Sequence, residues 1–245
     1  MTMALDTYFE TVVRLLGGVR ITQRAALEQA ADWVAHALLS DKFIYAFGSG
    51  HSHALAEELF YRAGGLVRVV PVFDEKLMMH QSARGSSRWE RKEGYAEAVL
   101  ARYALAPGDV FFVVSNSGRN AVPIEMALGG KRRGAKVVAL VSARYCGAYP
   151  SRHSSGQKLP DVADLVIDNG GEPGDACVEI AGLLQKAGPT STITSACLLN
   201  AIIVEATARV VAAGGQPEIW TSANRGAGDA NAALLAKYEG RIPHL

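Results

Sequence analysis

The sequence has little of what marks several classes of protein. Its three cysteines, Cys146, Cys177 and Cys197, form no CxxC pair and show no metal-ligand spacing, which argues against a disulfide scaffold or a zinc site. The net charge is only +1, and the basic run 131–133 is too short for a nucleic-acid surface. The N-terminus lacks a basic start before an apolar core, and no later apolar run is expected to be long enough to span a bilayer. We therefore expect a cytoplasmic protein that binds neither nucleic acid nor membranes and uses no metal or organic cofactor.

Short apolar runs alternate with helical patterns along the chain. Five strands are predicted, at residues 43–47, 67–72, 110–114, 136–141 and 165–168. Helices between most of them indicate an α/β fold, a three-layer αβα sandwich around a five-stranded parallel sheet. An N-terminal helical extension is predicted to break near Thr22, which would cap its second helix. We expect a single domain over 1–245, with N-terminal helices at 1–40, a core at 41–213 and a C-terminal loop and helix at 214–245.

A serine-rich turn, Ser115 to Asn120, follows the predicted strand 110–114 and precedes a helical stretch. At such a strand end the free N–H groups and the dipole of the next helix favour an anion. The hydroxyls of Ser115 and Ser117, together with Gly118, permit a phosphate to approach closely. Because no lysine is embedded as in a Walker loop, a small phosphoester fits better than a triphosphate. The alternative is that Ser117 only caps the helix.

A second turn of this kind, Gly48-Ser49-Gly50-His51-Ser52, follows the predicted strand 43–47. Open α/β sheets bind ligands outside the carboxyl ends of their strands. Both turns could therefore converge on one crevice.

These two turns together resemble those of the sugar isomerase (SIS) domain, and the segment 189–195 looks like that family's third ligand-facing element. With Ser-Arg-His-Ser-Ser-Gly at 151–156 and Ser-Ala-Asn at 222–224, the chain is similar to a SIS subgroup named UPF0309, often labelled phosphoheptose isomerase. The resemblance covers most of the chain. It implies a three-layer αβα fold, a homodimer or homotetramer, and a phosphorylated sugar as the ligand. Known relatives isomerise sugar phosphates, eliminate a C3 substituent, or only bind the sugar as regulators.

The resemblance also implies which residues bind the substrate. Phosphate would be held by side chains of both turns and by backbone N–H groups of the second, while the start of the helix at 191 would face the sugar or the phosphate. The expected substrate-binding residues are Ser49, Ser52, Ser115, Asn116, Ser117, Gly118, Arg119, Asn120, Ser191 and Thr192. The glutamate of phosphoheptose isomerases does not align, because its position falls near Tyr61 or Arg62.

Isomerisation and elimination both begin by removing a proton next to a carbonyl carbon, which requires a positioned base. Glu58 is the expected catalytic base, because it would share a helix face with His51. His51 or His153 would act as the acid. The alternatives are an i,i+4 pair of Glu58 with Arg62, a capping role for His51 and a solvated loop around His153.

Two long segments, 73–91 and 142–160, fit no regular pattern and are expected to be lids or binding loops. Near the C-terminus, Asn224, Asp229 and Asn231 could close over the sugar, reach a neighbouring subunit or cap the last helix. We expect a SIS enzyme that abstracts the C2 proton of a hexose or amino-sugar 6-phosphate, as an aldose-ketose isomerase or as a C3-eliminating dehydratase or lyase. The alternative is a non-catalytic sugar-phosphate sensor.

Overall fold

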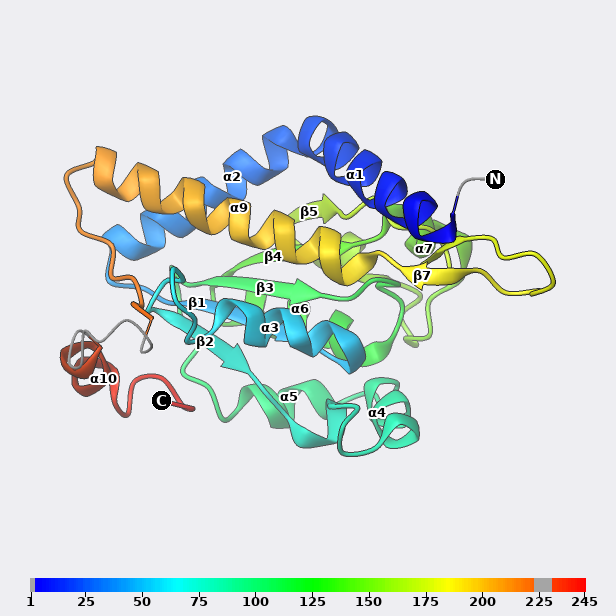
Figure 1. The fold of residues 1–245 in the computed structure, drawn as a ribbon. Coiled ribbons are helices and arrows are strands. Elements are labelled where there is room, and N and C mark those ends of the chain that lie inside the picture. Colours follow the sequence, from blue (N-terminus) through cyan, green and yellow to red (C-terminus); the bar gives the residue numbers. More distant parts are fainter. Residues whose placement is uncertain (1–2, 223–230) are drawn as a thin grey trace.

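A parallel sheet of five strands forms the centre of the molecule, in the order β2-β1-β3-β4-β5. The computed structural model describes residues 3–222 and 231–245. The strands are β1 (Ile44–Gly48), β2 (Val69–Val72), β3 (Val110–Val114), β4 (Lys136–Val141) and β5 (Leu165–Asp168). Figure 1 shows them between two layers of helices. All five predicted strands are present, and the α/β fold class is confirmed.

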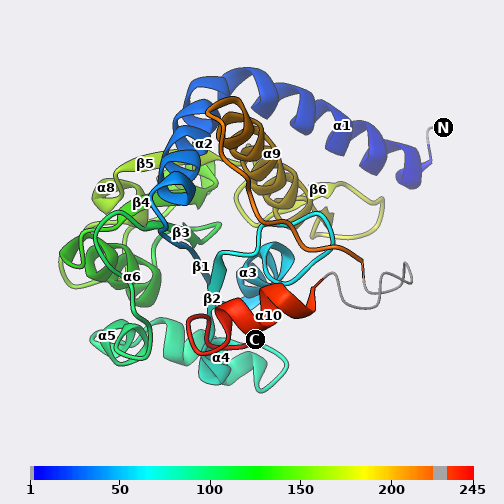
Figure 2. The same ribbon diagram turned by 90° about the vertical axis from the view of Figure 1, so that its left-hand side faces the viewer.

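Helices cover both faces of this sheet, and a separate apolar cluster lies under each layer. One layer contains α1 (Ala4–Thr22), α2 (Arg24–Leu39), α3 (His53–Leu59) and α9 (Ser191–Ala212). The other contains α4 (Ala83–Glu90), α5 (Tyr95–Leu100), α6 (Ala121–Arg132), α8 (Leu159–Val162) and α10 (Ala232–Tyr238), as Figure 2 shows. Strand residues alternate between the clusters: Phe112 packs under the first layer and Phe111 under the second, both fully buried. Burial of each of these phenylalanine side chains stabilises the fold by about 1.5–3 kcal/mol.

The N-terminal helices meet at Gln23, one residue after the predicted cap. Thr22 is not a cap of α2, and that prediction was wrong. Its hydroxyl instead donates to the carbonyl of Gly18 at 3.1 Å, the back-bonding that threonine uses inside a helix. The two helices therefore follow each other almost without interruption.

Helix α9 corrects another expectation from the sequence. This helix has 22 residues, and an 18-residue window of it has a mean hydropathy of 1.5, so within the described part of the chain it meets the length and composition of a membrane span. The expectation that no later apolar run is long enough was wrong. Leu198, Leu199 and Ile202 of α9 are buried against α2, α3 and the sheet. Core packing thus accounts for much of the apolar character of this helix.

The two segments without a regular pattern contain short elements. Between β2 and β3 lie the 3₁₀ turn η2 (Glu75–Leu77), α4 and α5, and α7 (Ala143–Ala148) follows β4. An antiparallel pair that the sequence did not predict, β6 (Ala176–Val178) and β7 (Ala187–Pro189), leads into α9. Of the three polar C-terminal residues, Asn224 and Asp229 lie outside the described residues. Asn231 hydrogen-bonds to the backbone of Thr221 through both ends of its amide, at 3.0 and 2.9 Å.

Candidate functional site

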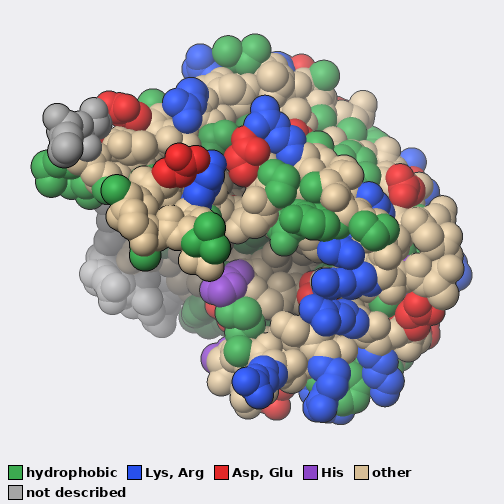
Figure 3. All heavy atoms as spheres, turned by 90° about the vertical axis from the view of Figure 1, so that its right-hand side faces the viewer, with side chains coloured by type: hydrophobic (Ala, Val, Ile, Leu, Met, Phe, Trp, Pro, Cys, Tyr) green, Lys and Arg blue, Asp and Glu red, His purple; other side chains and the backbone are tan. Residues whose placement is uncertain are grey.

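Two loops leave the sheet side by side at the carboxyl ends of neighbouring strands. Gly48 of β1 pairs in register with Val114 of β3, so the glycine loop (residues 48–52) and the serine loop (residues 115–120) start at the same height. The first loop ends in the 3₁₀ turn η1 (Gly50–Ser52) and leads into α3, and α6 follows the second loop. Figure 3 views the molecule from the side toward which β3 points in Figure 1. It shows a hollow with a histidine at its edge and a column of lysine and arginine side chains beside it.

Both loops are folded so tightly that glycine is required at one position in each. A Cβ on Gly48 would lie 2.1 Å from the carbonyl oxygen of Ser52. Gly118 has φ +59°, and its Cβ would lie 2.8 Å from Sγ of Cys146. A side chain at either position would displace backbone or a buried thiol. The shape of both loops thus depends on these two residues.

Within the serine loop, the side chains have different surroundings. Ser115 is buried, and its Oγ accepts from the N–H of Gly118 at 3.3 Å. Asn116 faces the carboxyl end of β5, where its Oδ1 accepts from Nδ2 of Asn169 at 3.0 Å. The hydroxyl of Ser117 is half-buried and bonds to none of the described residues. Among these three, Ser117 is the side chain left available to a ligand.

The two loops are joined by a residue that the sequence did not single out, Glu90. One carboxylate oxygen accepts from Oγ of Ser49 and the other from Nδ2 of Asn120, both at 2.8 Å. Burial raises the pKa of Glu90, although the hydrogen bonds from Ser49 and Asn120 and the charges of Arg91 and Arg152 act in the opposite direction. Glu90 is the last residue of α4, inside the segment 73–91. It therefore reaches both loops only because α4 packs across the strand ends.

Of the three expected catalytic residues, Glu58 lies on the side of α3 that faces α9. It forms an ion pair with Arg62, the alternative that the sequence left open, and accepts from Nδ2 of Asn200 at 2.9 Å. Helix α3 begins at His53 rather than at His51. His51 belongs to the preceding 3₁₀ turn and is exposed. The helix face that was expected to align His51 with Glu58 therefore does not exist.

His153 lies on the other layer of the molecule, against α6. Its Nδ1 is 2.7 Å from Oγ of Ser155, and its Nε2 is 3.6 Å from Oε1 of Glu125. The next residue, Ser154, bonds to the carboxylate of Glu93 through its N–H and its hydroxyl. These contacts hold the loop against the molecule. The structure does not bring His153 and Glu58 together, since they contact helices on opposite faces of the sheet.

The remaining predicted ligands vary in exposure and partners. Ser52 is half-buried, and its N–H closes the turn onto the carbonyl of Ser49 at 3.0 Å. Thr192 is exposed, whereas Ser191 is half-buried at the start of α9. The carboxylate of Asp175 accepts from the N–H and from the hydroxyl of Ser191, at 2.8 and 2.5 Å. A carboxylate thus already occupies the N-terminus of α9.

Asp175 provides a test of what this helix end does. Replacing Asp175 by Asn removes the charge that complements the α9 dipole, and we expect the free energy of unfolding to fall by about 1 kcal/mol. Urea unfolding would measure it. Affinity for sugar phosphates should stay unchanged. A clear gain in affinity would instead show that the ligand reaches Ser191 and Thr192, where Asp175 repels it.

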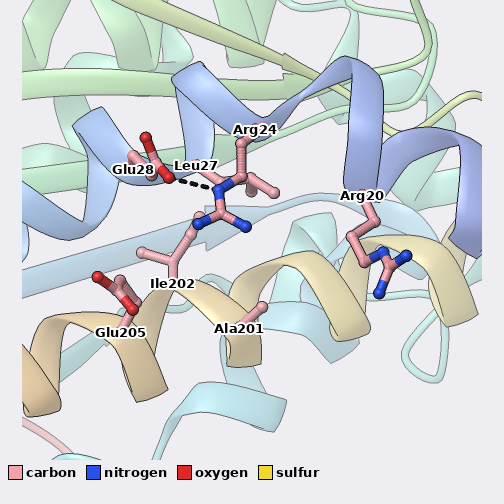
Figure 4. Close-up of a pocket in the computed structure, with 7 residues that line it drawn as sticks. All are labelled: Arg20, Arg24, Leu27, Glu28, Ala201, Ile202 and Glu205. Atoms are coloured by element: carbon pink, nitrogen blue, oxygen red, sulfur yellow. Dashed lines mark hydrogen bonds and ion pairs between the residues drawn. The ribbon is translucent and has the colours of Figure 1, made fainter.

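A further groove lies between the N-terminal helices and α9 (Figure 4). Arg24 and Glu28, one turn apart on α2, form an ion pair on one side of the groove. Ala201, Ile202 and Glu205 of α9 line the opposite side. Neither loop at the strand ends contributes to it, so it does not belong to the candidate site. Across residues 3–222 and 231–245, no group of three or more His, Cys, Asp or Glu side chains could hold a metal ion.

Both the sequence and the fold of this chain are similar to those of known proteins. The sequence profile of the SIS domain matches residues 7–142, more than half of the chain. A UPF0309 protein of Brucella canis is 44% identical over 246 residues and covers 100% of both chains. The chain belongs to the SIS domain family.

Solved structures share the fold at low sequence identity. A phosphoheptose isomerase from Neisseria gonorrhoeae has a TM-score of 0.53 and 18% identity, covering 83% of this chain and 96% of its own. The NanR protein of Vibrio vulnificus, in complex with ManNAc-6P, has a TM-score of 0.54 and 19% identity, covering 86% of this chain and 65% of its own. The predicted SIS fold and the UPF0309 resemblance are thus confirmed.

Proposed function

We propose that the crevice between the glycine loop and the serine loop binds a hexose or amino-sugar 6-phosphate and that the protein abstracts its C2 proton. The observation that carries this proposal is Glu90, a half-buried carboxyl that bridges the two loops through Ser49 and Asn120. It places a titratable group between two strand-end loops. Isomerisation of the sugar, or elimination of its C3 substituent, would follow from the same first step.

The phosphate belongs on the serine loop in this proposal. Helix α6 starts at Ala121, directly after the loop, so its first N–H groups and its dipole favour an anion there. The unbonded hydroxyl of Ser117 can donate to a phosphate oxygen. Ser52, half-buried on the glycine loop, can close the site from the other side.

Glu90 is a better candidate for the base than Glu58. Its hydrogen-bond partners are neutral and its pKa is raised, which suits a base that must take and return a proton near neutral pH. Glu58 is instead tied to Arg62 and Asn200 on the side of α3 that faces α9. The exposed His51 on the glycine loop is the acid candidate within reach of the same crevice.

Binding of the phosphate can be tested on the serine loop. The double replacement Ser115→Ala and Ser117→Ala should weaken the affinity for sugar 6-phosphates by at least about tenfold, because two hydroxyls that contact the phosphate or shape its loop are lost. Calorimetry with glucose 6-phosphate, glucosamine 6-phosphate and ManNAc-6P would measure this, with circular dichroism as the check on folding. An unchanged affinity would show that the hydroxyls of Ser115 and Ser117 do not bind the phosphate.

The reaction can be tested in deuterated water. Incubation with the same sugars should exchange deuterium into C2, which NMR detects. A ketose product would identify an isomerase, and an unsaturated product a dehydratase or lyase. Tight binding without exchange would identify a sugar-phosphate sensor. As further parts of the proposal, the protein works in the cytoplasm as a homodimer or homotetramer, for which the exposed apolar side chains Phe9 and Val13 of α1 offer a surface.

A further inference from the structure

Three arginines lie together beside the serine loop. Arg119 belongs to the loop, and its carbonyl accepts from the N–H of Arg152 at 2.8 Å. Nη1 of Arg152 donates to Oδ1 of Asn120 at 3.1 Å. Arg91 follows Glu90 directly at the end of α4. Burial, followed by the charges of Arg91 and Arg119, lowers the pKa of Arg152, so the three guanidinium groups are close enough to act on each other.

No carboxylate among the described residues forms an ion pair with this arginine cluster (Arg91, Arg119 and Arg152). Other arginines form ion pairs, such as Arg133 with Glu97 and Arg209 with Glu205. Glu90 acts on Arg91 and Arg152 through its charge, but its two oxygens accept from Ser49 and Asn120 rather than from a guanidinium group. Nε of Arg119 is buried and has no hydrogen-bond partner. Three like charges beside a single carboxyl group still repel each other, and a bound anion would relieve that repulsion.

The guanidinium of Arg119 is also oriented. It stacks over the ring of Tyr149, with Cζ at 5.3 Å from the ring centroid. Stacking on an aromatic face leaves the edge of a guanidinium free, and that edge is the side that binds carboxylate or phosphate in a bidentate way. In Figure 3, lysine and arginine side chains form a column beside the hollow on this face of the molecule. Cationic side chains on this face thus lie next to the hollow.

The cluster lies at one end of a polar chain that crosses the site. Hydrogen bonds run from Ser49 to Glu90, from Glu90 to Asn120 and from Asn120 to Arg152. Arg152 is therefore separated from the glycine loop by two side chains. A ligand held between the loops would present one end to the serine loop and could present another group to the arginines.

We propose that the arginine cluster is a subsite for a second anionic group, so that the substrate is a sugar phosphate that also carries a carboxylate or a second phosphate. This inference rests on the proposed function and deepens it. The guanidinium groups of Arg91 and Arg119 make the contacts to that group. Arg152 adds charge while it stays bonded to Asn120.

Matched sugars test the subsite. Calorimetry would compare fructose 6-phosphate with fructose 1,6-bisphosphate, and glucose 6-phosphate with 6-phosphogluconate, so that a second phosphate and a carboxylate are distinguished. At least one doubly anionic sugar should bind about tenfold or more tightly than its partner, as expected for hydrogen bonds to charged groups. In the variant Arg91→Gln this ratio should fall toward one, while monophosphate affinity stays within about threefold.

The control is the double variant Arg84→Gln and Arg88→Gln, which removes two exposed arginines of α4 outside the cluster and should keep the full ratio. The double variant Arg91→Gln and Arg119→Gln should remove the rest of the ratio. Equal affinity of both sugars in each wild-type pair, with the monophosphates bound, would overturn the inference and leave the proposed function standing. Equal weakening of all four sugars by Arg91→Gln would show that the cluster holds the 6-phosphate itself, which also overturns it. No binding of any sugar would overturn both.

Discussion

Replacing Glu90 by Gln should slow C2 proton exchange by about 10²- to 10⁴-fold and leave sugar-phosphate affinity within a few-fold. The amide is close in shape to the carboxyl but cannot accept the proton. The bridge between the loops should survive, because the amide oxygen can still accept from Asn120 and the Ser49 hydroxyl can rotate to accept from the new NH₂ group. Exchange followed by NMR, together with calorimetric affinity, separates the two effects.

The matched control for this variant is Glu58→Gln. Glu58 is tied to Arg62 and Asn200 on the α9 side of α3, so its replacement should leave most of the exchange rate intact. In the wild type, exchange should rise with pH through the raised pKa of Glu90, because the base must be ionised to accept a proton. Loss of exchange in Glu58→Gln with full activity in Glu90→Gln would return the catalytic role to Glu58.

Replacing Gly48 by Ala should weaken sugar-phosphate affinity at least about tenfold and should also lower the free energy of unfolding. The added Cβ would meet the carbonyl oxygen of Ser52 at 2.1 Å and the N–H nitrogen of His53 at 2.8 Å. Backbone atoms cannot rotate away as a side chain can, so the whole glycine loop must shift. Calorimetry and urea unfolding of Gly48→Ala would measure the two effects.

The control for a general glycine effect is Gly17→Ala. Gly17 lies inside α1, and a Cβ there would meet nothing within 4 Å. Alanine should therefore stabilise the helix by about 0.5–1 kcal/mol without changing affinity. Unchanged sugar affinity in Gly48→Ala would mean that the glycine loop does not form part of the ligand site.

The sheet and the two loops could be predicted because each is defined by a few consecutive residues. A buried run such as Val110–Val114, followed by serines, glycine and a helical pattern, carries its strand, turn and helix in one continuous stretch. Boundaries were accurate to one or two residues in most of these elements. The same local reading failed at Thr22, where a helix interior and a helix cap use the same residue type.

The carboxyl that joins the loops could not be predicted in this way. Glu90 is 41 residues from Ser49 and 30 from Asn120 along the chain, and no spacing in the sequence reveals that α4 crosses the strand ends. The start of α3 was also misplaced, because a 3₁₀ turn at Gly50–Ser52 precedes the helix and leaves His51 outside it. Local patterns therefore locate the two loops, whereas the contacts that join them depend on tertiary packing.

The strand order β2-β1-β3-β4-β5 has a consequence for how such a site can change. From β1 the chain winds outward through α3 on one face of the sheet, and from β3 it winds the opposite way through α6 on the other face. The two connections diverge, and a gap opens between them whatever side chains they carry. The crevice that we propose as the sugar-phosphate site is thus a product of winding direction. Substitutions in the loops can exchange one ligand or reaction for another without closing the space in which it takes place.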